Sequence, residues 1–552
     1  MKIKFLVFFT FLSLNIFAQL EVAPNKYYFE LTDKNHNLYS LDSPEEFLSF
    51  RALQRRANQN IMINYSDLPV SQFYIDSIRN CGVEILNVSK WFNSVLVYSE
   101  NPEPIELIKN LSFVIDTLRF KVETKDERML GAEYKVLRDI QKGEEGDFYY
   151  KYGPSQNQIF MHNGQKLHNK GYRGQGMLIA VIDAGFTATL DVPSLQHVFQ
   201  DNRVIATRNF VHGGDSVFNY STHGMRVFSI LAGNSPYYLV GSAPEAEYVL
   251  LMSEDPITEN LIEEINWISA AEFADSIGTD IVNVSLGYLT FDMPVNNHSY
   301  EDMDGETTII ALAAREASHK GMLLVVSAAN SGESQSHPWI ASPGDAKDII
   351  TAGAVYADST YAAFSSIGPS YDGRIKPDLV AMGAGTFNQE PNGGFGYGNG
   401  TSFSAPLLAG MFACLWQQFP EKTNFEIMEI AKQTANLYNN PNAYLGYGIP
   451  DFDLASQILT VEKEISKMEK LTLSPNPYYH DFNIHLDNNI GDEIVIEVSD
   501  LLCRKHYLWF KLRASENNQT VNIPDLANLK PSIYIVTVSI NSKKYSAKLI
   551  KQ

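Results

Sequence analysis

The chain has 552 residues, of which 45% are hydrophobic and 19% charged, and its formal net charge is −21. This length predicts three or four domains. The composition is that of an ordinary globular protein and excludes a disordered chain. The negative charge and the lack of a Lys/Arg-rich run exclude nucleic acid as a partner, because binding phosphate needs clustered basic side chains.

The N-terminus has the pattern of an export signal. Lys2 and Lys4 precede the apolar run Phe5–Leu14, and the small residue Ala18 marks a plausible cleavage point before Gln19. A buried first helix or strand is the alternative interpretation. We expect a signal peptide over residues 1–18, export through the periplasm, and a secreted or surface-located mature protein.

The next region, residues 19–123, has a mixed pattern that predicts a small α+β domain. A helix is expected over residues 43–58, and its apolar face would consist of Phe47, Phe50, Leu53 and Ala57. Val83–Leu86 and Ser94–Tyr98 are expected strands. Residues 124–157 are rich in Lys, Glu, Asp and Gly, and we expect an exposed linker that is cut during processing, with the first cut between Thr124 and Gln158.

From residue 158 to residue 460 the pattern predicts a larger α/β domain. Runs rich in Val, Ile and Leu lack polar alternation, which is typical of strands buried on both faces of a parallel sheet. The expected strands are Met177–Ile182, Asp280–Val284, Met322–Ala328 and Ile349–Val355, and the expected crossover helices are Leu261–Ile277 and Thr307–Lys320. We predict a doubly wound domain, in which sites form at the carboxyl ends of the strands.

A charged segment, residues 461–470, is an expected linker before a C-terminal β domain at residues 471–552. Alternating runs there predict a small β-sandwich of six or seven strands. Three of them are Glu493–Val498, Ile533–Ile540 and Tyr545–Ile550. The cysteines Cys81, Cys414 and Cys503 are far apart and lack metal-ligand spacing, so neither a zinc site nor thiol chemistry is expected.

Two residues of the α/β domain are candidates for catalysis whose local sequence is ambiguous. Asp183 ends the first buried strand, where a carboxylate must be paired or must cap the next turn. His223, in Ser-Thr-His-Gly, begins the amphipathic segment Met225–Ala232, and either helix initiation or catalysis would explain it. By contrast, we expect His162, His168 and His197 on the surface because polar residues surround them.

Ser402 has the most specific setting. The glycine-rich segment Asn392–Gly400 leads into Gly400-Thr-Ser-Phe-Ser-Ala-Pro406 and then into a long apolar helix that continues to Trp416. A serine at a helix N-terminus is surrounded by free backbone N–H groups and the positive end of the helix dipole, which favour a developing oxyanion. An N-cap serine is the structural alternative, but the length of the motif favours a nucleophile.

These motifs resemble those of subtilisin-like serine peptidases (the S8 family), which have the catalytic residues in the order Asp, His, Ser. The resemblance covers residues 158–459. It implies that Asp183, His223 and Ser402 form a catalytic triad and that Asn330 is the side-chain donor to the oxyanion. Phe403, Ala329 and Met225 stand where Met, Gly and Thr are more usual, and none of these departures removes a functional group.

The resemblance also implies a substrate pocket. Its two walls would be formed by two strand-end segments, Ser285, Leu286 and Gly287 on one side and Ser327, Ala328 and Ala329 on the other, with residues 341–343 near the base. These residues are small and uncharged, so we expect sizeable apolar side chains in the pocket. Glu333 nearby provides an alternative, a preference for basic side chains.

The flanking regions resemble known attachments of this family. Residues 21–122 resemble a propeptide of the bacteroidetes type, which implies that the chain's own propeptide acts as an intramolecular inhibitor. The Leu473-Ser-Pro-Asn-Pro477 segment and the final Lys548-Leu-Ile-Lys551 are similar to type IX secretion sorting domains, which implies that the secretion machinery is a partner. A purely structural β module is the alternative.

No cofactor is expected. Family members often bind calcium in surface loops, and Asp302-Met-Asp-Gly305 superficially resembles such a loop but lacks the downstream ligand spacing. Two rival functions require different residues. A sedolisin-like peptidase would have Glu in place of His223 and Asp in place of Asn330, whereas a catalytically inactive surface binding protein usually loses a triad residue.

Overall fold

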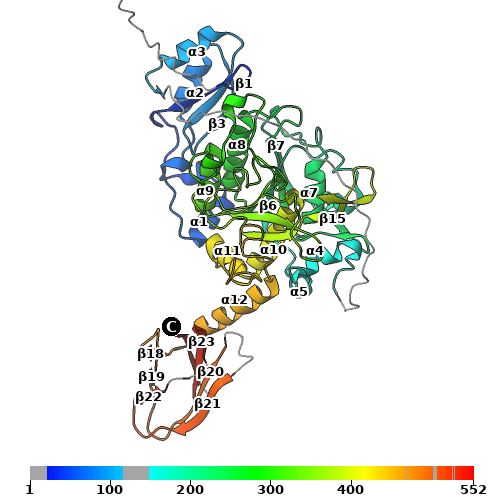
Figure 1. The fold of residues 1–552 in the computed structure, drawn as a ribbon. Helices are drawn as coiled ribbons and strands as arrows, with labels where there is room; N and C mark the ends of the chain where they lie inside the picture. Colours follow the sequence, from blue (N-terminus) through cyan, green and yellow to red (C-terminus); the bar gives the residue numbers. More distant parts are fainter. Residues whose placement is uncertain are drawn as a thin grey trace, which may run out of the picture. The chain divides into compact units, whose positions relative to one another are not determined.

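The computed structural model describes residues 21–115 and 148–467, and residues 469–551 apart from 501–505, 525, 527–528 and 542. The expected signal peptide, most of the expected linker and Cys503 lie outside these ranges. The chain forms two compact units, Met1–Pro450 and Asp451–Gln552, which we describe separately (Figure 1). Among the described residues, no helix combines the length and apolar character needed to cross a membrane.

The first unit is built around a parallel sheet of seven strands with the order β14-β13-β12-β11-β6-β10-β7. The strands are β6 (Leu178–Asp183), β7 (Val204–Asn209), β10 (Glu247–Met252), β11 (Ile281–Val284), β12 (Leu323–Ser327), β13 (Ile350–Val355) and β14 (Leu379–Met382). Every residue of β6, β11, β12 and β13 is buried. The predicted doubly wound α/β domain is therefore confirmed, as are the four strands expected from the sequence.

Helices cover both faces of this sheet (Figure 1). Two of them, α8 (Ile262–Ile277) and α9 (Ile309–His319), pack against each other and against strands β6, β10 and β12, while α7 (His223–Ala232) and α10 (Thr401–Gln418) pack together on the other face. Alternate β6 residues Leu178, Ala180 and Ile182 enter the core shared with α8 and α9. Because side chains alternate across a strand, the intervening residues face the layer of α7 and α10.

Shorter elements complete the α/β domain. They are the helices α4 (Gln156–Phe160), α5 (Gly164–Asn169), α6 (Gln196–Gln200) and α11 (Asn424–Gln433), and the strand pairs β8 (Asn234–Ser235) with β9 (Leu239–Val240) and β15 (Ala384–Gln389) with β16 (Phe395–Asn399). The expectation of surface histidines is wrong here. His162 and His168 are completely buried, His197 is half-buried, and burial lowers the pKa of His162 and His168 to about 4.

The N-terminal domain, residues 21–115, is an antiparallel sheet covered by helices. Its strands are β1 (Glu21–Ala23), β2 (Lys26–Leu31), β3 (Glu84–Ser89), β4 (Ser94–Tyr98) and β5 (Val114–Ile115), and its helices are α1 (Phe50–Asn58), α2 (Gln72–Arg79) and α3 (Pro102–Lys109). The order is β1-β2-β4-β3, with β5 pairing β2. This confirms the expected α+β domain and the strands near residues 83–86 and 94–98.

Helix α1 corrects the expected apolar face. It begins at Phe50, seven residues later than expected, and Phe50 is 81% exposed. The buried residues of α1 are Ala52, Arg55 and Arg56. The guanidinium groups of Arg55 and Arg56 lie 2.5 and 2.7 Å from the Asp275 carboxylate on α8. The apolar periodicity predicted the wrong buried face, because the face that is buried contains the two arginines that pair with Asp275 across the interface.

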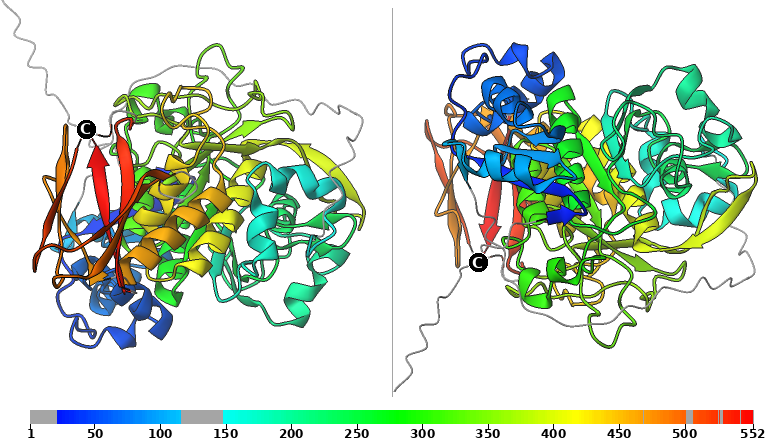
Figure 2. Two further views of the ribbon diagram at one scale, coloured as in Figure 1. Left: turned by 90° about the horizontal axis from the view of Figure 1, so that it is seen from below. Right: turned by 90° about the horizontal axis from the view of Figure 1, so that it is seen from above.

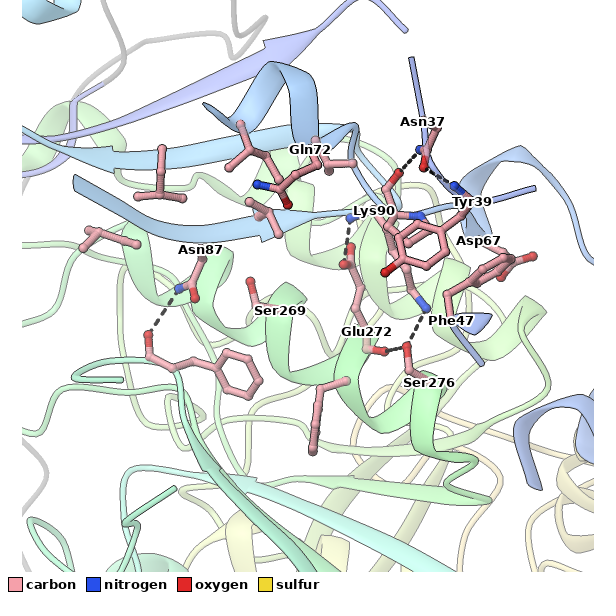
Figure 3. A pocket seen from close by; sticks show the side chains of 18 of the residues that line it. Asn37, Tyr39, Phe47, Asp67, Gln72, Asn87, Lys90, Ser269, Glu272 and Ser276 are labelled. Atoms are coloured by element: carbon pink, nitrogen blue, oxygen red, sulfur yellow. Dashed lines mark hydrogen bonds between the residues drawn. The ribbon is translucent and has the colours of Figure 1, made fainter. Parts of the chain in front are cut away.

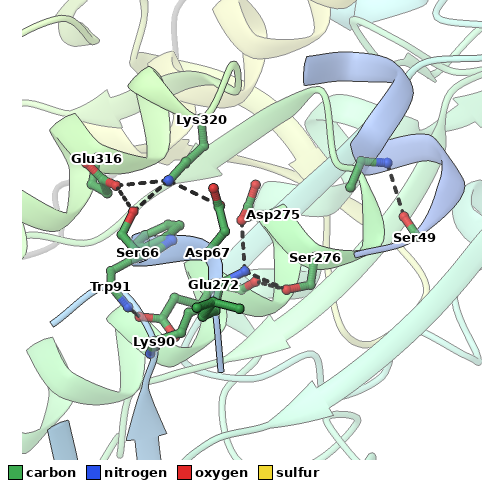
Figure 4. Close-up of polar contacts among 12 residues, drawn as sticks. Ser49, Ser66, Asp67, Lys90, Trp91, Glu272, Asp275, Ser276, Glu316 and Lys320 are labelled. Atoms are coloured by element: carbon green, nitrogen blue, oxygen red, sulfur yellow. Dashed lines mark hydrogen bonds and ion pairs between the residues drawn. The ribbon is translucent and has the colours of Figure 1, made fainter. Parts of the chain in front are cut away.

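The β3–β4 hairpin lies against α8, and Figure 2 shows the N-terminal domain beside this helix. Its backbone N–H groups at Lys90 and Trp91 donate to the Glu272 carboxylate over 2.8 and 3.0 Å. The ammonium group of Lys90 lies 2.9 Å from Asp275 (Figure 4). Burial would raise the pKa of Asp275, but Lys90, Arg56 and Arg55 together hold it well below its usual range. The interface is thus an extensive buried charge network.

A pocket of about 550 Å³ lies in this interface, lined from one side by the N-terminal domain and from the other by α8 (Figure 3). Its lining includes Tyr39, Lys90, Glu272 and Ser276, and none of the expected catalytic residues is among its walls. The pocket therefore belongs to the contact between the two domains and not to the expected reaction site.

The second unit contains α12 (Phe452–Lys467) and two small sheets. The first sheet has the order β17-β24-β23-β20-β21 and the second β18-β19-β22. Their strands are β17 (Glu469–Lys470), β18 (Thr472–Ser474), β19 (Phe482–His485), β20 (Glu493–Ser499), β21 (His506–Arg513), β22 (Thr520–Ile523), β23 (Ser532–Ile540) and β24 (Lys543–Lys551). They share one apolar core, which confirms a C-terminal β module. Part of the expected linker, residues 461–467, is helical in α12.

Candidate active site

Asp183 is the last residue of β6 and is completely buried. Its Oδ1 accepts hydrogen bonds from the Ala184 N–H (2.8 Å) and from Nδ1 of His223 (2.8 Å). In the register of the sheet it lies opposite Met252, the last residue of β10. A carboxylate at this depth is costly unless it is hydrogen-bonded and paired, and the imidazole supplies the pairing.

A glycine lets His223 approach this carboxylate. His223 is the first residue of α7, and a Cβ on the next residue, Gly224, would lie 2.5 Å from the Gly185 carbonyl oxygen and 3.0 Å from the Asp183 Cβ. The Gly224 N–H also donates to that carbonyl over 3.1 Å. The N-terminus of α7 can therefore pack directly against the end of β6 because residue 224 has no side chain.

The electrostatic surroundings of His223 favour its protonated form. Burial lowers its pKa, but the charge of Asp183, the hydrogen bond between the two residues and the charge of Glu254 outweigh that effect, so the pKa is raised. The ring is still 36% exposed, and it stacks on Phe403 with ring centres 6.2 Å apart. Its Nε2 side therefore remains accessible for proton transfer.

Ser402 is the second residue of α10, close to the helix N-terminus. Its Oγ donates to the Ser285 carbonyl over 3.1 Å, and the Ser285 Oγ donates to the Ser402 carbonyl over 2.9 Å. Within the described part of the chain, the Ser402 hydroxyl makes no hydrogen bond with His223. Such bonds are often long before substrate binds, and rotation about the Cα–Cβ bond of Ser402 moves the oxygen away from Ser285.

Asn330 follows β12 by three residues and is exposed. Its Oδ1 accepts from the N–H and the hydroxyl of Thr401, over 2.9 and 3.1 Å. With Oδ1 engaged, the Nδ2 group points the other way. A Cβ built on Gly400 would lie 3.8 Å from both Asn330 Nδ2 and Ser402 Cβ, so this amide donor and the serine lie on the same side of the loop.

The two expected pocket walls are also brought together. Segments that follow the neighbouring strands β11 and β12 lie side by side, and the Ser327 Oγ donates to the Leu286 carbonyl over 3.1 Å. Gly287 is exposed at the end of one wall, whereas Ala328 is completely buried and donates its N–H to the Ala352 carbonyl of β13. The exposed part of this region consists of backbone and small side chains.

Sequence reasoning missed Glu254, two residues beyond the end of β10. It is half-buried. Burial, followed by the charges of Glu259 and Asp183, raises its pKa. The rule that sites gather at carboxyl ends of parallel strands could have identified it, because β10 is paired with β6 in register with Asp183.

The loop at residues 302–305 uses its carboxylates in turns. Asp302 accepts from the N–H and hydroxyl of Ser299, and Asp304 accepts from the N–H groups of Glu306 and Thr307. In the ranges that the structure covers, no group of three or more His, Cys, Asp or Glu side chains gathers as a metal site. The two carboxylates of this loop, Asp302 and Asp304, therefore stabilise its turns.

Comparisons with known proteins agree on three regions of the chain. The model of the Subtilase family matches residues 174–448, that of the Peptidase S8 propeptide domain of Bacteroidota matches residues 26–133, and that of the Secretion system C-terminal sorting domain matches residues 472–552. The first match contains Asp183, His223, Asn330 and Ser402. The N-terminal domain is therefore a propeptide domain, and the C-terminal domain is of a kind associated with secretion.

Individual relatives are similar over about half of the chain. Subtilisin NAT from Bacillus subtilis subsp. natto is 27% identical over 294 residues, which cover 53% of this chain and 68% of that protein. Serine protease AprX from Bacillus subtilis (strain 168) is 31% identical over 317 residues, covering 51% and 65%. The solved MycP3 protease from the type VII (ESX-3) secretion system is 19% identical, covers 56% of this chain and 91% of that chain, and has a TM-score of 0.43.

Proposed function

The chain belongs to the subtilase family, and from that premise we propose that it is a secreted serine endopeptidase that hydrolyses peptide bonds through an acyl-enzyme. The observation that carries the proposal is the 2.8 Å hydrogen bond between Asp183 and His223 at the carboxyl end of the sheet, with Ser402 at the N-terminus of α10. Nucleophile, base and orienting carboxylate are the three residue types that this chemistry uses, which supports the proposal.

In the proposed reaction His223 is the general base. It takes the Ser402 proton while Oγ attacks the substrate carbonyl, and it then returns the proton to the leaving amine. Asp183 accepts from Nδ1, which fixes the tautomer with a free Nε2 and stabilises the imidazolium once it forms. Its burial keeps this carboxylate away from water, so the interaction with the imidazolium is little screened.

The developing oxyanion has two proposed donors. The Asn330 amide is oriented by Thr401, because its oxygen is held by two hydrogen bonds and its Nδ2 is left to donate. The Ser402 N–H lies in the first turn of α10, where backbone donors lack an intrahelical acceptor. Fixed donors of this kind lower the barrier because they need no reorganisation during the reaction.

We further propose that the propeptide domain acts as an intramolecular inhibitor until the segment after it is cut, and that the C-terminal domain is recognised by the secretion machinery. The support for the first part is the buried network between the propeptide domain and α8, formed by Arg55, Arg56 and Lys90 with Asp275. Charge-assisted hydrogen bonds of 2.5–2.9 Å are the stronger kind, so this contact should persist after cleavage of the connecting chain.

A fluorophosphonate probe tests the enzymatic proposal directly, because it reacts only with an activated serine. Processed protein should be labelled at Ser402, and both Ser402→Ala and His223→Ala should abolish labelling. A Ser404→Ala variant, two residues further along α10, should keep it. Intact, processed protein that stays unlabelled would instead support a catalytically inactive binding protein on a peptidase scaffold.

A further inference from the structure

One pocket wall contains an alanine in a conformation that alanine rarely adopts. Ala329 has φ = 76°, in the left-handed region where Cβ crowds the backbone. Its carbonyl accepts from the Ser366 N–H over 3.0 Å, and the next residue, Asn330, is held by Thr401. The surrounding contacts therefore fix a strained residue directly beside the proposed oxyanion donor, a position at which strain indicates a functional constraint.

The chemistry determines where a substrate side chain must lie. The leaving amine has to face His223, which protonates it. The residue on the acyl side of the cleaved bond is then turned away from His223, and Ser285, which directly follows β11, is hydrogen-bonded to Ser402. Neighbouring strands are only about 4.8 Å apart, and the hydrogen bond from Ser327 to Leu286 keeps the two walls close beyond the strand ends.

The Ala329 methyl group fills the space between these walls. A Cβ built on Gly287 would lie 3.6 Å from the Ala329 Cβ and 3.5 Å from the Ala341 Cβ. Since a carbon–carbon bond is about 1.5 Å long, the Gly287 Cα is at most about 5 Å from either methyl. A side-chain carbon placed between two carbon walls needs about 7 Å between them, so no side chain can pass at this level.

The two methyl groups lie at different depths. Ala341 is 3% exposed, and the next residue, Ser342, is joined to Tyr288 by backbone hydrogen bonds of 2.7 and 3.2 Å in both directions. Ala341 therefore lies at the base of the pocket. Ala329 is half-buried and adjoins Asn330, so it lies at the mouth and closes the pocket above the base.

We propose that Ala329 restricts the acyl-side residue of the substrate to small side chains, those of glycine, alanine and serine. This specificity rests on the proposed endopeptidase function, and it replaces the expectation of sizeable apolar side chains. The sequence favoured large side chains because most wall residues are small, but walls that lie only about 5 Å apart at Gly287 and Ala329 leave no room for a large side chain.

Ala329→Gly is the informative variant because glycine adopts a positive φ without strain and the change should not endanger folding. Ala188→Gly is its matched control, since Ala188 also has a positive φ (69°) but is not among the pocket residues. Processed enzyme and both variants would be assayed on peptides that differ only in the acyl-side residue: Gly, Ala, Ser, Leu or Phe. Ala341→Gly and the double variant with Ala329→Gly complete the set.

The wild-type enzyme and Ala188→Gly should cleave after Ala with a kcat/KM at least about 10-fold above that after Leu or Phe. Ala329→Gly should reduce this ratio by about 10-fold or more, Ala341→Gly alone should change it little, and the double variant should reduce it most. Equal cleavage after Phe and Ala by the wild type, or an unchanged ratio in Ala329→Gly, would overturn the inference while leaving the proposed function intact. Absence of both cleavage and fluorophosphonate labelling would overturn both.

Discussion

Lys90 of the propeptide domain and Asp275 of α8 form a buried ion pair with an Nζ–Oδ2 distance of 2.9 Å (Figure 4). The Asp275 side chain is completely buried, and the Lys90 side chain is 11% exposed. The same carboxylate receives Arg55 and Arg56 through its other oxygen. One catalytic-domain carboxylate thus binds three cations of the domain that covers it, and the first prediction concerns its contribution to that contact.

Replacing Lys90 by Met should weaken the hold of the propeptide domain on the catalytic domain. The variant keeps the apolar stem and loses a charged hydrogen bond, worth about 1.5–3 kcal/mol, or about 10- to 100-fold in the dissociation constant. The half-time of dissociation after cleavage of the linker, followed by gel filtration, measures the effect. Glu106→Gln, which breaks the exposed pair with Lys109 on α3, is the control. An unchanged half-time for Lys90→Met would contradict a stabilising role.

The acid limb of the pH–rate profile should lie above the ordinary His pKa of 6.5. Asp183 and Glu254 raise the pKa of His223, and the base must be neutral to accept the Ser402 proton. Burial raises the pKa of Glu254 to about 8, so this carboxyl is mostly protonated where His223 titrates, and Glu254→Gln should move the limb in kcat/KM to lower pH by only a small fraction of a unit, at most about 0.3. Glu429→Gln, on the surface of α11, should leave it in place. A shift to higher pH in Glu254→Gln would contradict this electrostatic account.

The architecture and the candidate site residues could be proposed from sequence because both depend on local patterns. Buried parallel strands read as unbroken apolar runs, and Asp183 stands at the end of one such run. Ser402 follows a glycine-rich segment and lies at the start of an apolar helix, and this combination can be recognised in consecutive residues of the sequence. Once the parallel sheet is in place, the carboxyl ends of the neighbouring strands β6, β11 and β12 lie at one edge, which brings Asp183, Ser285 and Asn330 to the same end of the domain.

The features that sequence reasoning misjudged depend on long-range pairing of polar groups. Arg55 and Arg56 are buried in α1 because the Asp275 carboxylate, more than 200 residues away, neutralises them, and no periodicity within α1 contains that information. His168 is buried because the Tyr152 hydroxyl and the Ser242 carbonyl satisfy its ring nitrogens. The closeness of Gly287 and Ala329 is likewise a tertiary distance that no local pattern reveals.

Glu263→Gln should stabilise the folded enzyme at alkaline pH. Burial, together with the charges of Glu254 and Glu259, raises the pKa of Glu263, and its side chain is 1% exposed. Because the folded state binds this proton more tightly than the unfolded state, the free energy of unfolding falls as pH rises above the unfolded pKa of about 4.5. Glutamine resembles the protonated form and avoids this loss.

Thermal unfolding measures the effect of Glu263→Gln at two pH values. At pH 8 the midpoint should rise by a few degrees, about 2–4 °C per kcal/mol for a domain of this size. Near pH 4 the carboxyl is protonated in both states, so variant and wild type should unfold at nearly the same temperature. A lower midpoint at pH 8 would mean that the carboxylate is ionised and stabilising in the folded protein.

Asn330→Leu should lower kcat with little effect on KM. The amide would donate to the oxyanion, which forms only in the transition state, and loss of one such donor in subtilisin costs about 10²–10³-fold. Thr401→Val is the matched variant, because it removes only the hydroxyl that donates to Asn330 Oδ1 and keeps the Nδ2 donor. It should lose less than about 10-fold. Equal losses in the two variants would indicate that Asn330 acts by holding α10 in place.

Gly224→Ala should separate His223 from Asp183 without changing either residue. The added methyl would meet the Gly185 carbonyl oxygen at 2.5 Å and the Asp183 Cβ at 3.0 Å, both of which belong to a rigid strand end, so the N-terminus of α7 has to move. Displacement of a catalytic group by about 1 Å costs roughly 10²-fold in rate, and such overpacking destabilises by about 1–3 kcal/mol.

Gly176→Ala is the control for Gly224→Ala. It shows whether a loss of activity comes from a moved catalytic group or only from lower stability. Gly176 has φ = 76° and open space around its Cα, so alanine there adds backbone strain of about 1–2 kcal/mol away from the site. If the two variants unfold at similar temperatures but only Gly224→Ala loses turnover and fluorophosphonate labelling, the loss arises from the moved imidazole. Full activity in a folded Gly224→Ala variant would show that the contact between α7 and β6 can relax, and that catalysis does not depend on this close approach.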